Sequence, residues 1–148
     1  AKEFVEYVTL EELNKQADII TLHCPYCKGE NDKMINDNFI SNLKDGAIII
    51  NTARGELQDV DAIIRGIENG KIGGFGTDVF SNEKEFFFKD MTGKEIDKTV
   101  EKLISLYPRA LVTPHIGSYT DEALTNMIEI SYENLDEFLR TGDCANKL

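Results

Sequence analysis

Apolar residues in this chain gather in short runs, separated by longer stretches with helical spacing. Such runs occupy residues 17–23, 47–50 and 110–113, and a glycine-rich run occupies residues 73–80. Short, nearly continuous apolar runs are typical of strands in a parallel sheet. We interpret these four runs as strands, and a weak alternation at residues 4–8 as a further strand or the end of one.

The run at residues 47–50 begins the clearest unit of the chain. All four residues are apolar, which is the pattern of a strand covered on both faces. Asp59 then opens a helix with isoleucines at helical spacing, and Gly70 stands where a C-terminal cap belongs. The pattern of residues 46–80 therefore predicts a strand, a helix and a second strand parallel to the first. Such a crossover connection is almost always right-handed.

Caps and apolar spacing predict helices between and after the strands, beginning with a capping box formed by Thr9 and Glu12. The alternation of strands and helices predicts an α/β domain with a mostly parallel sheet. The charged stretch 81–109 interrupts this order, and irregular stretches of that length are often functional. The expected helices cover residues 9–16, 36–45, 59–69, 100–106 and 120–141.

Charge excludes two classes of partner. The 148 residues include 16 basic and 27 acidic side chains, for a formal charge of -11. Such a balance argues against binding to the phosphate backbone of nucleic acid and against binding to an anionic membrane surface. No stretch approaches the length of a membrane span, so we expect a cytoplasmic protein.

Candidate chemistry stands at the ends of the predicted strands. Arg54 follows the strand at 47–50, Asp78 belongs to the next strand, and His115 follows the last. Ligands of open parallel sheets bind at this carboxyl edge. Taken singly, an arginine here also suits a surface ion pair, and a lone histidine is more often structural than catalytic. Their conjunction favours a chemical site.

Cys24 and Cys27 have the dithiol spacing of thioredoxin-like redox sites. In those sites a helix N-terminus stabilises the first thiolate, whereas residues 28–32 show no apolar periodicity for a helix. A zinc site with Cys144 would lack a fourth ligand. A thiol redox role stays open as an alternative, beside the simpler interpretation of a loop with a half-buried Cys24.

No stretch of the chain fits the G-x-G-x-x-G pattern of a dinucleotide-binding turn. If the chain binds a dinucleotide, its phosphate-binding first unit is missing. We therefore expect the chain to be a fragment of a longer protein.

Four blocks, in order, resemble the signature blocks of the D-2-hydroxyacid dehydrogenases. Residues 119–123 and the tail at 141–144 are most similar to the D-lactate and (R)-2-hydroxyglutarate dehydrogenase branch. The resemblance covers essentially the whole chain. The blocks are LHCP at 22–25, NTARGELQD at 51–59, GFGTDVF at 74–80 and TPH at 113–115.

This resemblance implies the C-terminal part of an NAD-dependent oxidoreductase that reduces 2-oxo acids to D-2-hydroxy acids. It implies a Rossmann-like parallel sheet that lacks its first βαβ unit, with residues 1–118 as a partial NAD-binding domain. The helix at 120–141 would pack on an absent substrate domain, and the full-length protein is expected to be a homodimer. The fragment alone should be inactive. Because transcriptional corepressors also use this fold, a non-catalytic NAD-sensing module is the alternative.

The resemblance also assigns residues, and none of them to a metal. Arg54 would bind the substrate carboxylate and polarise its carbonyl, since the planar guanidinium matches a carboxylate. His115 would act as acid and base, and Glu83 would hold its ring and favour the protonated form. The expected cofactor-binding residues are Cys24, Pro25, Asn31, Thr52, Ala53 and Asp78.

Ser118 stands where the D-lactate enzymes of this family tend to have an aromatic residue. A serine implies a wider and more polar pocket. The resemblance therefore implies a substrate larger than pyruvate.

Overall fold

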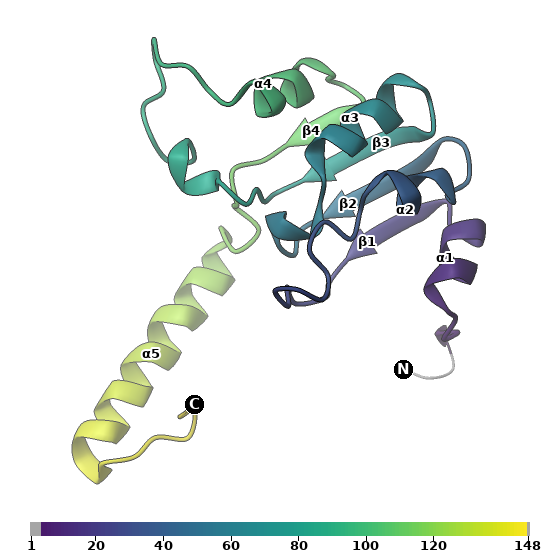
Figure 1. The fold of residues 1–148 in the computed structure, drawn as a ribbon. Helices are drawn as coiled ribbons and strands as arrows, with labels where there is room; N and C mark the ends of the chain where they lie inside the picture. The colour runs from purple at the N-terminus through teal and green to yellow at the C-terminus, as the bar shows by residue number, and fades with distance from the viewer. Residues whose placement is uncertain (1–3, 148) are drawn as a thin grey trace. The chain divides into compact units, whose positions relative to one another are not determined.

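The structure is a computed structural model that describes residues 4–147. Its centre is a sheet of four strands in the order β1-β2-β3-β4, and every neighbouring pair is parallel (Figure 1). The predicted α/β order and parallel direction are confirmed. The strands are β1 (Ile19–Leu22), β2 (Ala47–Asn51), β3 (Ile72–Thr77) and β4 (Ala110–Val112).

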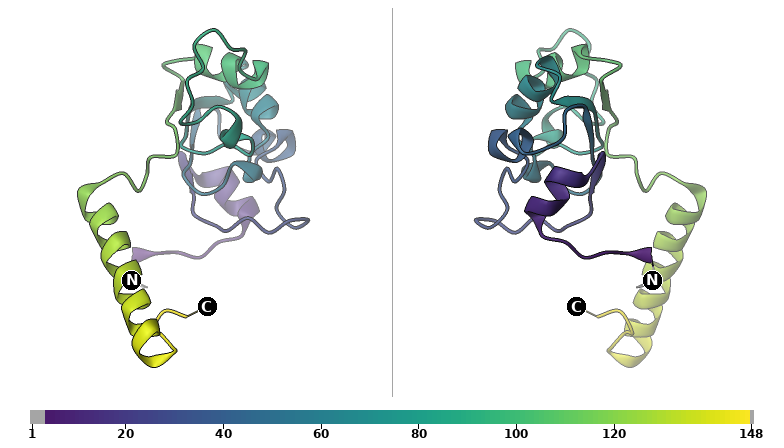
Figure 2. Two further views of the ribbon diagram at one scale, coloured as in Figure 1. Left: turned by 90° about the vertical axis from the view of Figure 1, so that its left-hand side faces the viewer. Right: turned by 90° about the vertical axis from the view of Figure 1, so that its right-hand side faces the viewer.

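Three helices connect the strands and lie on one side of the sheet, as Figures 1 and 2 show. Between them and the sheet lies the hydrophobic core, in which Ile20, Ile49 and Phe75 are at most 5% exposed. Helix α1 (Leu10–Gln16) precedes β1. The connecting helices are α2 (Asp37–Ser41), α3 (Val60–Glu68) and α4 (Lys98–Ser105).

The other face of the sheet has no covering layer within residues 4–115. Ile19 is 59% exposed, Ile48 38% and Leu111 56%. Within residues 4–115, the prediction that β2 is covered on both faces is therefore wrong. Since each strand joins its next neighbour by a crossover of the same hand, all three helices fall on the same side.

Local signals account for the helix ends. The Thr9 capping box forms as predicted, and the side chains of Asn36, Asp59 and Thr120 accept backbone N–H groups at the starts of α2, α3 and α5 (Asp121–Thr141). The expectation of a strand at 4–8 is wrong. Residues 5–8 have no regular structure, because no strand of the described chain pairs with them.

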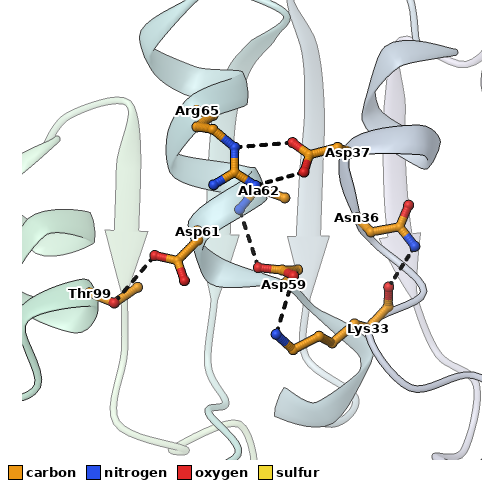
Figure 3. Close-up of polar contacts among 8 residues, drawn as sticks. All are labelled: Lys33, Asn36, Asp37, Asp59, Asp61, Ala62, Arg65 and Thr99. Atoms are coloured by element: carbon orange, nitrogen blue, oxygen red, sulfur yellow. Dashed lines mark hydrogen bonds and ion pairs between the residues drawn. The ribbon is translucent and has the colours of Figure 1, made fainter.

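Polar contacts tie the helices together on their solvent side (Figure 3). Arg65 of α3 donates to both carboxylate oxygens of Asp37 on α2, at 3.2 and 2.7 Å. Asp59 caps α3 by accepting the N–H of Ala62 at 3.3 Å and receives Lys33 Nζ at 3.2 Å. These ion pairs are largely exposed, so the core contributes most of the stability.

The described residues fall into two compact units, one up to His115 and one from Ile116 onward. The second unit is built on α5 (Asp121–Thr141), which begins after the cap Thr120 and ends at Gly142 in a left-handed conformation with φ 77°. This is the long helix predicted at 120–141. Across residues 4–147, no helix combines the length and the apolar character that a membrane crossing requires.

Candidate active site

The carboxyl edge of the sheet brings three predicted site residues to neighbouring strand ends. Arg54 follows β2, Asp78 follows β3, and His115 follows β4. Because the strands are parallel and adjacent, their last residues share one edge. Residues that are far apart in sequence therefore gather here.

His115 is held from two directions. Its ring Nδ1 lies 2.8 Å from Oε1 of Glu83, whose other oxygen accepts the N–H of Phe80 at 3.3 Å. The backbone of His115 is left-handed, with φ 51°, and its N–H donates to the carbonyl of Thr113 at 3.1 Å. A positive φ is uncommon outside glycine and is concentrated at functional sites. The contact with Glu83 therefore engages Nδ1 and not Nε2.

Arg54 is exposed at the end of a tight turn. Its Nη1 donates to the carbonyl of Ala53 at 2.7 Å, and it forms no ion pair with a carboxylate within residues 4–147. Nε and Nη2 therefore stay available. A planar cation presented in this way suits a small carboxylate ligand.

Asp78 is 7% exposed and accepts a hydrogen bond from Thr113 Oγ1 at 2.5 Å. The bond joins the end of β3 to the residue that follows β4, two positions before His115. A buried, hydrogen-bonded carboxylate fixes the geometry of the groups beside it.

An open hollow of about 670 Å³ lies along the ends of β1 and β2. It brings together five predicted site residues, which are Cys24, Pro25, Thr52, Ala53 and Arg54. Its lining also includes His23 of the LHCP block, and Tyr26 and Glu56, for which the sequence analysis made no prediction. Their positions next to the LHCP block and within the NTARGELQD block are the only sequence signal that points to them.

Asn31 does not line this hollow. Its Oδ1 accepts the N–H of Cys27 at 2.8 Å, and its Nδ2 donates to the carbonyl of Pro25 at 2.9 Å. Both ends of the amide thus brace the loop that follows β1. In the same loop, the hydrogen bond that Tyr26 donates to Asp32 raises the pKa of Tyr26 to about 12. The phenol that lines the hollow therefore stays neutral at physiological pH.

The two cysteines of the C-x-x-C motif lie in a stretch, residues 23–27, that contains no turn or bend. No helix begins at Cys24, whereas a helix N-terminus stabilises the first thiolate in thioredoxin-like sites. Cys24 is half-buried and Cys27 exposed. The geometry disfavours the dithiol interpretation.

Metal-ligating side chains do not gather in the part of the chain that the structure describes. No group of three or more His, Cys, Asp or Glu residues there is placed to hold a metal ion.

Comparison with known proteins agrees with this architecture. The sequence model of a family described as D-isomer specific 2-hydroxyacid dehydrogenase, NAD binding domain, matches residues 1–117. An aromatic 2-oxoacid reductase of Clostridium sporogenes is 45% identical over 99% of this chain, which covers 44% of that protein. The chain thus spans less than half the length of this relative.

Solved structures give the same result. A D-lactate dehydrogenase from Sporolactobacillus matches with a TM-score of 0.93 and 38% identity, over 99% of this chain and 44% of that one. The D-lactate dehydrogenase of Lactobacillus jensenii, solved with NAD+, matches with a TM-score of 0.92 and 35% identity, again over 99% and 44%.

Proposed function

Since this chain belongs to the D-isomer specific 2-hydroxyacid dehydrogenase family, we propose that it forms the NAD-binding and catalytic part of an oxidoreductase that reduces 2-oxo acids to D-2-hydroxy acids. The observation that carries the proposal is the 2.8 Å contact between His115 and Glu83 at the same sheet edge as Arg54. A cation without an ion partner in residues 4–147 and a histidine–carboxylate pair are the two protein groups that this reduction needs.

The hollow beside Arg54 suits a dinucleotide. Cys24, Pro25, Thr52 and Ala53 line it with small, uncharged side chains, which let a flat ring or a ribose approach the backbone. We propose that these residues and Asp78 hold NAD. Asn31 would act indirectly, because its amide holds the loop that follows β1. The bound cofactor would supply the hydride.

Arg54 and His115 would perform the remaining steps. Nε and Nη2 of Arg54 would grip the substrate carboxylate and draw electrons from the adjacent carbonyl. His115 would give a proton from Nε2 to the substrate oxygen as negative charge develops there. Glu83 accepts from Nδ1, so it fixes which nitrogen faces the substrate and stabilises the ring while it carries a proton.

The preferred substrate is proposed to be larger than pyruvate. Ser118, three positions after His115, is small and polar, whereas the resemblance implies an aromatic residue there in D-lactate enzymes. A relative that is 45% identical carries the name aromatic 2-oxoacid reductase. Both observations favour a bulky or aromatic 2-oxo acid.

The test is NADH oxidation by the complete gene product against 2-oxo acids of increasing size, with His115→Gln assayed in parallel. We expect the wild type to oxidise NADH with at least one 2-oxo acid and His115→Gln to lose this activity. NADH binding without turnover of any 2-oxo acid would overturn the proposal and favour a non-catalytic, NAD-sensing module.

Residues 1–148 by themselves are proposed to be inactive, because the chain covers only 44% of the length of its relatives. The homodimeric state and the cytoplasmic location expected for the full-length protein are also part of the proposal. Measurable turnover by residues 1–148 would contradict the proposed inactivity. Sedimentation of the complete protein tests the homodimeric state.

A further inference from the structure

A buried polar network lies between the turns that follow β2 and β3. Three of its side chains are almost fully enclosed, with Asn51 0%, Gln58 4% and Thr77 3% exposed. We call Asn51, Gln58, Thr77 and the carbonyl of Val79 the Gln58 network. Buried polar groups are costly unless they are paired, so a fully paired set fixes a single arrangement of its parts.

On one side, the Gln58 network holds the turn that carries Arg54. Asn51 Oδ1 accepts the N–H of Ala53 at 3.0 Å, and Asn51 Nδ2 donates to the carbonyl of Arg54 at 2.9 Å. The same Nδ2 donates to Gln58 Oε1 at 2.7 Å. The position of Arg54 along the sheet edge is thus tied to Gln58 through one side chain.

On the other side, the Gln58 network holds the segment that leads to Glu83. Gln58 Nε2 donates to the carbonyl of Val79 at 2.9 Å, and Thr77 Oγ1 lies 3.2 Å from Gln58 Oε1 and 2.9 Å from the same Val79 carbonyl. The next residue, Phe80, donates its N–H to Glu83 Oε2 at 3.3 Å. Gln58 is therefore two hydrogen bonds from the carboxylate that contacts His115.

Gly55 shows independently that the two turns are pressed together. A Cβ atom at Gly55 would lie 2.1 Å from the carbonyl carbon of Phe80 and 2.2 Å from the nitrogen of Ser81. Only glycine permits this approach of two backbones. The turn of Arg54 and the segment that leads to Glu83 are therefore in direct backbone contact, and Gln58 is the side chain that spans them.

We propose that Gln58 is a positioning residue that sets the spacing between Arg54 and the Glu83–His115 pair. The inference rests on the proposed function, in which these groups act on one substrate. Gln58 suits the task because its amide accepts from Asn51 and donates to Val79 at the same time. Methionine of similar size can do neither, and glutamate at neutral pH can only accept.

The experiment compares Gln58→Met and Gln58→Glu in the complete gene product. After Gln58→Met, Asn51 still bonds to Arg54 and Thr77 still bonds to Val79, so the fold persists. Ile67→Val, at a fully buried position on α3, serves as the control for a general loss of stability. The readouts are KM for the 2-oxo acid, kcat, the dissociation constant of NADH and the midpoint of thermal unfolding.

Gln58→Met and Gln58→Glu are each expected to raise KM for the 2-oxo acid about 10-fold and to lower kcat. The reason is that a small misplacement of the reacting groups lowers the reaction rate. The dissociation constant of NADH should rise less than KM, because Cys24 and Pro25, which also line the proposed NAD site, lie outside the Gln58 network. Ile67→Val should lower the unfolding midpoint alone. An unchanged KM in both Gln58 variants, with only the stability lowered, would overturn the proposal.

Crystal structures of the wild type and Gln58→Met separate this inference from the proposed function. If the wild type turns over no 2-oxo acid, the proposed function fails, and the structures still decide the role of Gln58. A displaced or disordered Arg54 turn relative to Glu83 supports the positioning role. An unmoved turn rejects it.

Discussion

Nδ1 of His115 lies 2.8 Å from Oε1 of Glu83, although 32 residues separate the two along the chain. The 3₁₀ turn Glu83–Glu85 and the turn after β4 meet at this point. One ring nitrogen is thereby committed to the protein, and Nε2 is the nitrogen that we propose faces the substrate.

His115→Gln is expected to lower kcat by about 10²- to 10⁴-fold, because general acid–base catalysis contributes that much. Glu83→Gln keeps an acceptor for Nδ1 and should cost less than Glu83→Leu, which keeps none. Steady-state kinetics on the complete protein measures all three. Glu85→Gln, on the same turn and exposed, is the matched control, and equal loss from Glu85→Gln and Glu83→Leu would contradict the assignment.

Arg54→Lys keeps the positive charge but loses the planar fork. We expect kcat/KM for the 2-oxo acid to fall by about 10- to 150-fold, which corresponds to about 1.5–3 kcal/mol for hydrogen bonds to a charged group. NADH affinity should stay the same. The control is Arg65→Lys, an exposed arginine that pairs with Asp37 on the helix layer (Figure 3). Loss of NADH affinity in Arg54→Lys would argue for a role in cofactor binding instead.

Ser118→Phe is expected to narrow the range of substrates. The larger side chain should lower kcat/KM for aromatic 2-oxo acids by about 10-fold or more and leave pyruvate as the better substrate, because pocket volume discriminates by amounts of this size. Competition between pyruvate and phenylpyruvate measures the ratio directly. An unchanged ratio would remove Ser118 from the specificity pocket.

Asn14→Leu is expected to stabilise the protein. Asn14 on α1 is 6% exposed, and its Oδ1 has no hydrogen-bond partner in the described residues. Removal of an unpaired buried acceptor should raise the free energy of unfolding by about 1–2 kcal/mol. Thermal unfolding measures the gain, with the exposed Asn38→Leu as control. A lower midpoint in Asn14→Leu would show that Oδ1 has a partner in the complete protein.

Stability should decline below pH 4, in part through Asp59. Burial acts to raise its pKa, but the N–H of Ala62 and the charges of Lys33 and Arg65 outweigh burial and hold the pKa below its ordinary value of 3.8. A lowered folded-state pKa stabilises the protein above the ordinary value, and this stabilisation is lost as pH falls through the lowered value.

Asp59→Asn keeps a side-chain cap on α3 without titrating. Its free energy of unfolding should therefore fall less steeply between pH 5 and pH 2 than that of the wild type. Asp59→Ala, which removes the cap, should lose about 1 kcal/mol at neutral pH. Parallel pH curves for Asp59→Asn and the wild type would contradict this account.

Local sequence signals predict most of the fold. Caps such as Thr9, Asn36 and Thr120 stand at the helix starts that the structure shows, since a cap depends on residues within one turn. The short runs become strands in the expected order. The exception at residues 4–8 shows that an alternating pattern is insufficient where no neighbouring strand is present to pair with it.

The site is less accessible from sequence, because its contacts join distant segments. The pairing of Glu83 with His115 came from the family resemblance, and spacing alone gives no sign of it. The role of Gln58 could not be predicted, because glutamine is usually exposed. Its burial here depends on partners in β2 and in the turn after β3. The Gly55 contact with Phe80 is likewise invisible until the two turns are folded together.

The sheet face that residues 4–115 leave uncovered, with Ile19, Ile48 and Leu111, sets a short-range attraction against a long-range repulsion. Its apolar surface attracts other copies of the chain, while the formal charge of -11 keeps them apart. Added salt shortens the reach of the repulsion and leaves the attraction intact. We therefore expect residues 1–148 in isolation to stay dispersed in dilute buffer and to cluster in concentrated salt.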